Sequence, residues 1–246
     1  MKIVDVDGIV LQDTNYSESS KILNVLTKEY GLIGVMSKGS RNVKSKLRSV
    51  SRKLIYGTFH IYYKENGLST LIGVDIKNSY TNILSDLTSI SYASYIIDLV
   101  KQVIKENDSP DIYDLTISTL NKINEGLDPL VLTNILELKL LDYLGVRPSI
   151  DNCSMCGNTE GIISLSSSNG GFLCKNCYSD DKITSEKTIK MIRMYYYVDI
   201  NKITKLDVSD EVKKDINLFL DDYYDRYTGL FLKSRKFIKD LERLNM

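Results

Sequence analysis

Residues 54–77, LIYGTFHIYYKENGLSTLIGVDIK, carry the clearest structural pattern in this chain of 246 residues. Side chains alternate along the first half, so that Phe59 falls on one face of a strand and Tyr62 on the other. Asn66-Gly67 is a favoured pair for a two-residue type I′ turn, because both central positions of that turn need a positive φ. The stretch therefore predicts a β-hairpin with one buried face.

Three more short strands are expected before this hairpin. They are rich in Val, Ile and Leu and are separated by Gly, Asn and Ser, which favour turns. Five short strands in the first eighty residues predict a small closed or nearly closed barrel. The expected strands are 3–11, 20–27, 32–37, 54–63 and 68–77.

From about residue 81 the apolar spacing changes to that of amphipathic helices. Pro110 and Pro129 stand in the first turns of two of them. Gly126 and Gly145 follow their last turns, which is the usual order of Pro and Gly, and Asp128 is a candidate cap. The expected helices are 84–107, 110–126, 128–145, 185–198, 209–229 and 234–244.

These patterns predict an α+β protein without internal repeats. A barrel domain over 1–80 is followed by a helical domain over 81–246. The helical domain carries an insertion at about 150–180 that holds the cysteines.

All four cysteines fall in CSMCGNTEGIISLSSSNGGFLCKNC, residues 153–177. The spacing C-x2-C-x17-C-x2-C is typical of a structural zinc site, in which two tight knuckles supply four thiolates to a closed tetrahedral shell. IISL and GFLC predict a hairpin that brings the second knuckle beside the first. No coordination position is left for water, so the metal would be structural. The expected ligands of one zinc ion are Cys153, Cys156, Cys174 and Cys177.

Disulfides or a redox centre account less well for these cysteines. Four cysteines are too few to hold a chain of this length together by disulfides. The first residues, MKIVDVDGIV, carry aspartates where a signal peptide is apolar, so we expect a cytoplasmic chain with reduced thiols. A redox CxxC normally stands alone at a helix start in a βαβ context, which is missing. Two pairs of free structural cysteines remain as the alternative.

The composition, 43% hydrophobic and 26% charged, is that of an ordinary globular protein, and no apolar run approaches the roughly 18–20 residues that span a bilayer. The net charge is zero but unevenly distributed. Residues 1–80 hold twelve Lys/Arg and seven Asp/Glu, a balance of +5, and residues 81–246 hold twenty and twenty-five, a balance of −5. No acidic residue lies between Glu29 and Glu65. This asymmetry indicates that a polyanionic ligand binds the N-terminal part of the chain.

The basic excess is densest in SKGSRNVKSKLRSVSRK, residues 37–53, between the third and fourth expected strands. Ser, Gly and Asn favour a flexible loop whose cations would neutralise phosphates. Tyr56 and Tyr62 on the neighbouring strand would stack on bases without reading sequence, as in single-strand binding. A solvated basic loop, and tyrosines that only pack, are the alternatives. The residues expected to contact phosphates are Lys38, Arg41, Lys44, Lys46 and Arg48.

Sequence motifs of catalysis are absent. The chain has no GxxxxGK[ST], no GxGxxG and no GxSxG. Its only histidine, His60, excludes metal sites built from two or three imidazoles, and a lone histidine in a strand is usually a surface or internally satisfied residue. The acidic pairs Asp180-Asp181 and Asp221-Asp222 are sequence neighbours that point apart on a helix. The sequence predicts a binding protein and not an enzyme.

Four segments, in matching order and spacing, resemble the bacterial recombination mediator RecO family. They are GIVLQDTNYSESSKILNVLTKEYGLIGVMSKGSRNVKSK (8–46), LSDLTSISYASYIIDLV (84–100), ELKLLDYLGVRPSIDNCSMCG (137–157) and GGFLCKNC (170–177). The opening GIVL, the YSESSKI segment, KGSR with the following KS, and YASY are together quite specific. The similarity covers about Met1 to Cys177, and KSRKFIKDL (233–241) still resembles the family's last helix.

The resemblance implies an N-terminal OB-fold, a helical domain and a zinc-binding motif. It also implies single-stranded DNA binding and strand annealing, together with RecR-like and single-strand-binding proteins as partners, so that RecA can load. Where family segments carry arginine, this chain has Gln12, Asp13 and Thr14. We therefore expect a DNA repair and recombination mediator. The alternative is a zinc-ribbon assembly factor of transcription or translation that binds RNA or protein; a preference for single-stranded DNA over structured RNA separates the two.

Overall fold

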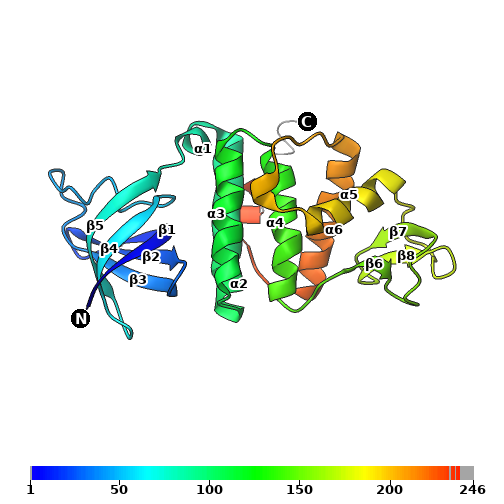
Figure 1. The fold of residues 1–246 in the computed structure, drawn as a ribbon, viewed down its shortest axis with the longest axis horizontal. Helices are drawn as coiled ribbons and strands as arrows, with labels where there is room; N and C mark the ends of the chain where they lie inside the picture. The colour runs from blue at the N-terminus through cyan, green and yellow to red at the C-terminus, as the bar shows by residue number, and fades with distance from the viewer. Residues whose placement is uncertain (1, 233, 236, 239–246) are drawn as a thin grey trace. The chain divides into compact units, whose positions relative to one another are not determined.

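The computed structural model describes residues 2–232, 234–235 and 237–238 of the chain. Contacts within the chain divide it into two compact units, Met1–Asn124 and Glu125–Met246. The first unit holds a barrel followed by helices, and the second holds helices and a small three-stranded sheet (Figure 1). The predicted α+β class is confirmed. The domain boundary expected after residue 80 stays a prediction, since the helices that follow the barrel belong to the first unit.

The barrel is closed, with the strand order β1-β2-β3-β5-β4 and with β4 pairing back to β1. β3 and β5 run parallel and the other neighbours antiparallel, an arrangement that matches the five-stranded Greek-key barrel of the OB-fold. All five expected strands are present, and β1 is longer than expected because β2 pairs with it as far as Tyr16. The strands are β1 Lys2–Tyr16, β2 Ser20–Thr27, β3 Gly31–Ser37, β4 Tyr56–Tyr63 and β5 Ser69–Asn78.

The alternation along β4 fills the barrel core as predicted. Phe59 and Ile61 are fully buried, whereas Tyr62 on the opposite face is 42% exposed. Burying side chains of this size stabilises the fold by about 1.5–3 kcal/mol each. The other core residues are Val6, Val10, Leu23, Val25, Val35, Val50, Ile55 and Leu71.

The turn between β4 and β5 differs from the predicted one. Five residues, 64–68, separate the strands, and of these Gly67 has a positive φ of 129° whereas Asn66 does not. The backbone N–H of Lys64 donates to the Ser69 hydroxyl at 3.1 Å. The type I′ prediction is wrong, because a side-chain hydroxyl closes a longer turn.

The helix predicted over 84–107 is two helices, α1 Thr81–Ser85 and α2 Leu87–Glu106. Asp86 separates them with an extended backbone and caps α2 by accepting the N–H of Ser89 at 2.7 Å. α3, Pro110–Asn124, starts at the predicted proline and completes the first unit.

Helix α4, Pro129–Tyr143, is buried on nearly all sides within the second unit. Asp128 caps it as predicted, by accepting the N–H groups of Leu130 and Val131. The unit also holds α5 Glu186–Tyr197, a short 3-10 turn Ile200–Lys202 and α6 Asp210–Tyr227. The helix predicted over 234–244 lies mostly outside the described residues. Over the part of the chain that the structure describes, no helix combines the length and apolarity needed to cross a membrane.

The small sheet has the order β6-β8-β7, and its strands are β6 Ser149–Cys153, β7 Ile162–Ser166 and β8 Gly171–Cys174. β7 and β8 form the predicted antiparallel hairpin, and β6 runs parallel to β8. Both β6 and β8 end at a cysteine, so their pairing brings Cys153 and Cys174 to the same end of the sheet. We call this sheet with its two cysteine turns the ribbon (residues 149–178).

Candidate metal centre and nucleic-acid interface

The four cysteine sulfurs gather at one end of the ribbon, within 4.8 Å of one another. The Sγ atoms of Cys156 and Cys174 are 3.7 Å apart, and all four thiols are free of disulfides. In a tetrahedron with zinc–sulfur bonds of about 2.3 Å, the sulfurs are about 3.8 Å apart. The cluster therefore has the donor chemistry and the size of a four-thiolate metal site, and these four cysteines can hold a metal ion.

Each cysteine pair sits on a tight backbone turn. The N–H of Gly157 donates to the Cys153 carbonyl at 2.8 Å, and the N–H of Tyr178 donates to the Cys174 carbonyl at 2.9 Å. Lys175 N–H donates to the Gly161 carbonyl, which joins the second turn to the start of β7. Because the turns are fixed by backbone hydrogen bonds, the positions of the sulfurs follow from the fold of the ribbon.

The thiols have unequal proton affinities. Burial raises the pKa of the Cys153 thiol, but the backbone N–H groups of Cys174, Cys156 and Met155 outweigh it and lower that pKa to about 6. Hydrogen bonding with Cys156, together with burial, raises the pKa of the Cys177 thiol to about 12. Thiols this close cannot all ionise without a compensating cation.

The ribbon is attached to α5 along β6. The Arg193 Nε donates to the Ile150 carbonyl at 2.8 Å, and its guanidinium lies over the Phe172 ring at 5.0 Å from the centroid. Tyr197 donates from its hydroxyl to the Asp151 carboxylate at 2.8 Å. The metal-site scaffold is thus held by charged and aromatic groups of one helix.

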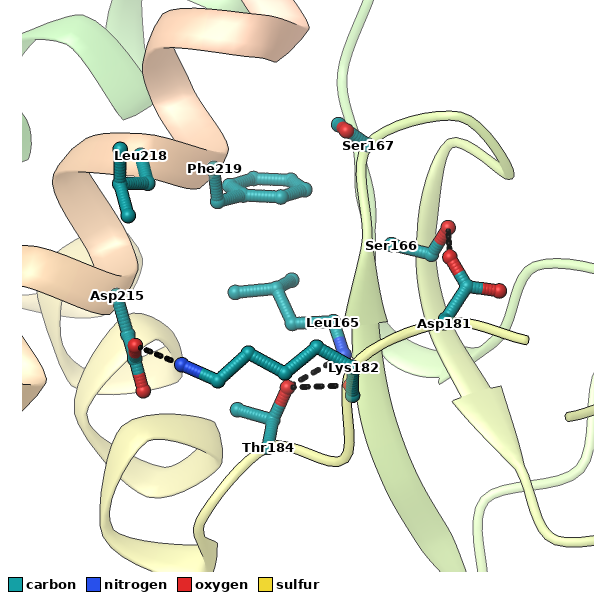
Figure 2. Close-up of a pocket in the computed structure, with 9 residues that line it drawn as sticks. All are labelled: Leu165, Ser166, Ser167, Asp181, Lys182, Thr184, Asp215, Leu218 and Phe219. Carbon is teal, nitrogen blue, oxygen red and sulfur yellow. Dashed lines mark hydrogen bonds and ion pairs between the residues drawn. The ribbon is translucent and has the colours of Figure 1, made fainter.

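A pocket of about 240 Å³ lies between β7, the segment after the second knuckle, and α6 (Figure 2). Leu165, Leu218 and Phe219 form its apolar sides. Lys182 extends across it, with its ammonium 2.6 Å from Asp215. The pocket is small and its lysine is already paired with a carboxylate of the same unit, so this region fixes the ribbon to α6.

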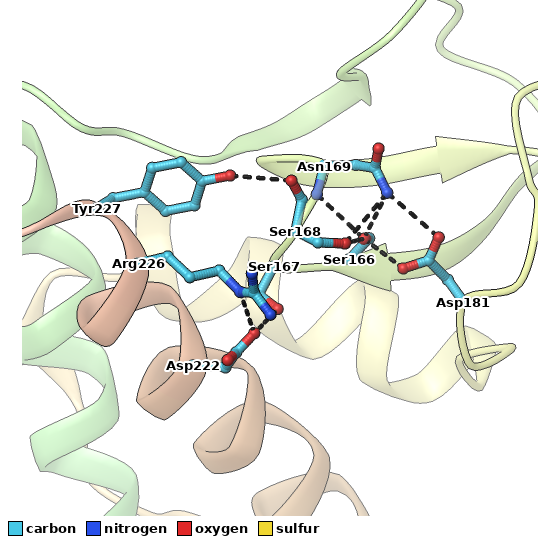
Figure 3. A network of polar contacts seen from close by, with 8 residues as sticks. All are labelled: Ser166, Ser167, Ser168, Asn169, Asp181, Asp222, Arg226 and Tyr227. Carbon is cyan, nitrogen blue, oxygen red and sulfur yellow. Dashed lines mark hydrogen bonds and ion pairs between the residues drawn. The ribbon is translucent and has the colours of Figure 1, made fainter.

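The hairpin tip between β7 and β8 is held by a polar network (Figure 3). Ser166 donates to Asp181 at 2.5 Å, and the backbone N–H of Asn169 donates to the Ser166 hydroxyl at 3.2 Å. Ser167 donates to Asp222, which also pairs with Arg226. These contacts join the turn-rich SSSNGG sequence to α6, a role that the sequence did not reveal.

The basic segment 37–53 folds into consecutive turns against the barrel. The Ser37 and Ser51 hydroxyls share a buried hydrogen bond of 2.7 Å, and Val50 enters the barrel core. Near the first end, the Arg41 backbone N–H also donates to the Ser19 carbonyl at 2.8 Å. The segment expected to be a flexible loop is therefore pinned at both ends by specific contacts.

An open groove of about 670 Å³ lies between the β1–β2 hairpin and this segment. Five cations line it, four of them from the segment and one, Lys21, from β2; of the five, Lys21 and Arg52 were not selected from the sequence. We call it the basic groove. Its lining residues are Asn15, Lys21, Ser40, Arg41, Val43, Ser45, Lys46, Arg48, Ser49 and Arg52.

Two of the five cations in the basic groove have fixed positions. The Lys21 ammonium is 2.5 Å from Asp13 and donates to the Ser51 carbonyl, and Arg41 donates to the Ser17 carbonyl at 2.8 Å. Of the ion pairs between described residues, none involves Arg41 or the three remaining groove cations, Lys46, Arg48 and Arg52. Four cations are therefore available to an anionic ligand.

The remaining residues selected from the sequence lie outside this lining. Lys38 and Lys44 are exposed on the same segment. The Tyr56 ring packs near Tyr80, at 6.4 Å between centroids, and lies under the Lys77 ammonium, so it is engaged within its own unit. Tyr62 is exposed on β4 opposite Ile3.

The outer face of the barrel beside Tyr62 is acidic. His60 Nδ1 is 2.6 Å from Asp5 and its Nε2 is 3.0 Å from Asp75. These two hydrogen bonds raise the pKa of His60. The lone histidine is thus an internally satisfied residue, as the sequence predicted, and its carboxylate neighbours make this face unfavourable for phosphates.

Comparison with known proteins assigns the chain that carries these two sites to a family. The family model described as "Recombination protein O N terminal" matches residues 1–80, and the model described as "Recombination protein O C terminal" matches residues 84–236. The chain belongs to the RecO family.

Three curated relatives of the RecO family cover nearly the whole chain. A "DNA repair protein RecO" of Listeria monocytogenes serotype 4b (strain CLIP80459) is 36% identical over 241 residues, 96% of this chain and 94% of the relative. A protein with the same name from Bacillus pumilus is also 36% identical, over 98% of this chain and 96% of the relative. One from Halalkalibacterium halodurans is 36% identical as well, over 97% of this chain and 95% of the relative. A role in DNA repair is thereby established at the level of the family.

Proposed function

We propose that this chain is a non-enzymatic DNA repair and recombination mediator that binds single-stranded DNA at the basic groove. In this proposal it promotes strand annealing and, with RecR-like and single-strand-binding proteins, helps to load a recombinase. The observation that carries the proposal is the convergence of five cations in one groove of an OB-fold barrel. Phosphate neutralisation supplies most of the affinity of sequence-independent binding.

The phosphate contacts proposed from the sequence fall into two groups. Arg41, Lys46 and Arg48 line the basic groove, whereas Lys38 and Lys44 would contact a strand only as it leaves the groove. Tyr56 and Tyr62 lie outside the groove, so the proposal does not depend on stacking by either ring.

Two measurements test the proposal. Fluorescence anisotropy should give tighter binding to single-stranded DNA than to a structured RNA of equal length, with affinity falling by about 0.7 log units per contacted phosphate for each log unit of salt. Complementation of a bacterial strain that lacks its RecO protein should restore resistance to DNA damage. Equal binding to structured RNA together with failed complementation would favour the zinc-ribbon assembly factor.

We also propose that Cys153, Cys156, Cys174 and Cys177 hold one structural zinc ion. Four sulfur donors of this spacing leave no open coordination position, so the metal would stabilise the ribbon and take no part in chemistry. Elemental analysis of reduced, metal-replete protein should give one zinc per chain. A value near zero in such a preparation would refute this assignment.

A further inference from the structure

We infer that the basic groove holds a DNA strand through its phosphodiester backbone alone and leaves the bases unstacked and free to pair. The inference rests on the proposed function, because it specifies how the proposed DNA site holds its ligand.

The lining has the chemistry of a phosphate site. Five of its ten side chains are Lys or Arg, three carry hydroxyls and one carries an amide, all of which can donate to phosphate oxygens. The remaining residue, Val43, is aliphatic and 81% exposed. None of the ten carries an aromatic ring or a carboxylate, so the groove offers many groups to a backbone and no ring to a base.

Two exposed tyrosines of the barrel strands, Tyr16 and Tyr62, belong to other surfaces. Tyr16 follows Asn15 in β1, and consecutive strand residues point to opposite faces, so its ring leaves the groove side. Tyr62 lies on β4 close to His60 and its two carboxylates, Asp5 and Asp75. A strand in the basic groove would therefore reach neither ring.

The cations stand on both sides of the groove. Lys21 is fixed at the start of β2, beside the turn of the β1–β2 hairpin, where it pairs with Asp13. On the opposite side, Arg48 and Arg52 are exposed on the folded segment. A backbone bound along the folded segment has its charge neutralised by these unpaired cations while its bases point to solvent. Neutralisation lowers the repulsion between two strands without covering the edges that pair, which is what annealing requires.

The binding arm of the test uses the full-length protein and three oligonucleotides of equal length. These are a thymidine strand, a strand of abasic sites with the same phosphates, and a thymidine strand with neutral methylphosphonate linkages. We expect the abasic strand to bind within about threefold of the thymidine strand, because each stacked base would contribute about five- to 150-fold. The neutral strand should lose binding by more than about tenfold.

The accessibility arm measures permanganate oxidation of the thymines. In the bound strand they should react at least as fast as in the free strand, since stacked thymines are protected. Tyr16→Ala and Tyr62→Ala should leave the affinity unchanged.

A pair of double variants separates failure of the inference from failure of the proposed function. Arg48→Ala/Arg52→Ala should weaken binding and flatten the salt slope by about 1.4. The control, Lys64→Ala/Lys105→Ala, removes two exposed lysines of the same unit outside the groove and should change neither. If the groove variant binds as well as the control, the DNA site lies elsewhere and the proposed function loses its observation. If it binds weakly but the abasic strand loses more than about tenfold, or the thymines become protected, the inference is wrong and the DNA site stands.

Discussion

At the scale of single residues, Asp13 sets how much of the Lys21 charge faces the basic groove. The two side chains are 2.5 Å apart and mostly buried, so Lys21 is neutralised before any phosphate arrives. The effect of the Asp13 carboxylate is to withdraw one cation from the groove.

Asp13→Asn should therefore tighten binding to single-stranded DNA. The amide keeps the shape of the side chain but releases the Lys21 ammonium, and one more phosphate contact would steepen the salt slope by about 0.7. Binding titrations between low and moderate salt measure both quantities. Glu65→Gln, which makes the same charge change in the exposed β4–β5 turn, is the control. A slope identical to that of the control would show that Lys21 does not reach DNA.

His60 should make the stability of the barrel depend on pH. Its hydrogen bonds to Asp5 and then to Asp75 raise its pKa above the ordinary 6.5. The charged imidazole therefore stabilises the fold fully below pH 6.5, and this contribution is lost as the pH rises through the folded-state pKa. Because the pairs are partly exposed, the contribution is about 0.2–1 kcal/mol.

The measurement compares the wild-type chain with His60→Gln. Urea unfolding should show a larger stability difference between them in mildly acidic than in alkaline buffer. Since the chain has one histidine, its imidazole resonances can be titrated by NMR without overlap. A folded-state pKa at or below 6.5 would contradict the role of the two carboxylates.

Single residues differ in how far their roles follow from sequence. The proposed metal ligands were found because two short spacings fix each cysteine pair, and any fold that closes the hairpin brings the pairs together. Lys21 and Arg52 were missed because they meet only through the register of β2 and the folded path of segment 37–53. Lys44 is the opposite case. It was predicted as a phosphate contact from the local charge density, but the fold leaves it outside the groove lining.

At the scale of secondary-structure elements, the ribbon depends on how closely β6 approaches β8. Gly171 marks this approach, with a φ of 143° and a space in which an added Cβ would lie 2.2 Å from the Ser149 carbonyl oxygen. Backbone atoms cannot move aside without separating the two strands, and these strands carry Cys153 and Cys174.

Gly171→Ala should therefore weaken metal binding and lower the melting temperature of the second unit. The neighbouring Gly170→Ala is a matched control, because Gly170 also has a positive φ, 76°, but has no atom within 4 Å of an added Cβ. The control variant should lose only the free energy of unfolding that its strained backbone costs, about 1–2 kcal/mol. Competition with a chromophoric chelator and thermal melting measure the two effects. Equal losses in both variants would mean that strain, and not the β6–β8 contact, dominates.

Elements followed from sequence wherever one local rule was sufficient. Alternation in β4 predicted the buried Phe59 and Ile61, and Pro110 marked the start of α3. The predictions failed where two local rules competed. Asn66-Gly67 favours a short turn, but the Ser69 hydroxyl closes a longer one, and Asp86 interrupts an apolar pattern that continues across it.

At the scale of the whole molecule, the two candidate sites belong to different compact units. The basic groove is built from residues 15–52 of the first unit, and the cysteine cluster from residues 153–177 of the second. Over the two units the charge is nearly even, with fifteen Lys/Arg and thirteen Asp/Glu in residues 1–124 and seventeen and nineteen in residues 125–246. A defect in the second unit should therefore leave DNA binding by the first unaffected.

Cys174→Ser in the full-length chain tests this independence. Cys174 is 2% exposed and its loss removes one proposed metal ligand. Structural zinc contributes an apparent free energy of about 10–16 kcal/mol in small peptides, comparable with the total stability of a domain, about 5–15 kcal/mol. The variant should therefore lose its zinc and the second unit should unfold at a lower temperature. Its affinity for single-stranded DNA should stay within about twofold, since sites that share no partners couple by less than about 0.5 kcal/mol.

The control for this prediction is Asn176→Ala, which changes an exposed residue of the same knuckle that is not a proposed ligand. Elemental analysis, thermal melting and DNA titration on the same preparations give the three readouts for both variants. The hydrogen-bond network at the hairpin tip joins the ribbon to Asp222 of α6, so loss of zinc should also loosen α6, as increased amide exchange along that helix. A fall in DNA affinity that tracks the zinc content would show instead that the ribbon takes part in the DNA interface, and the basic groove would then be only one part of it.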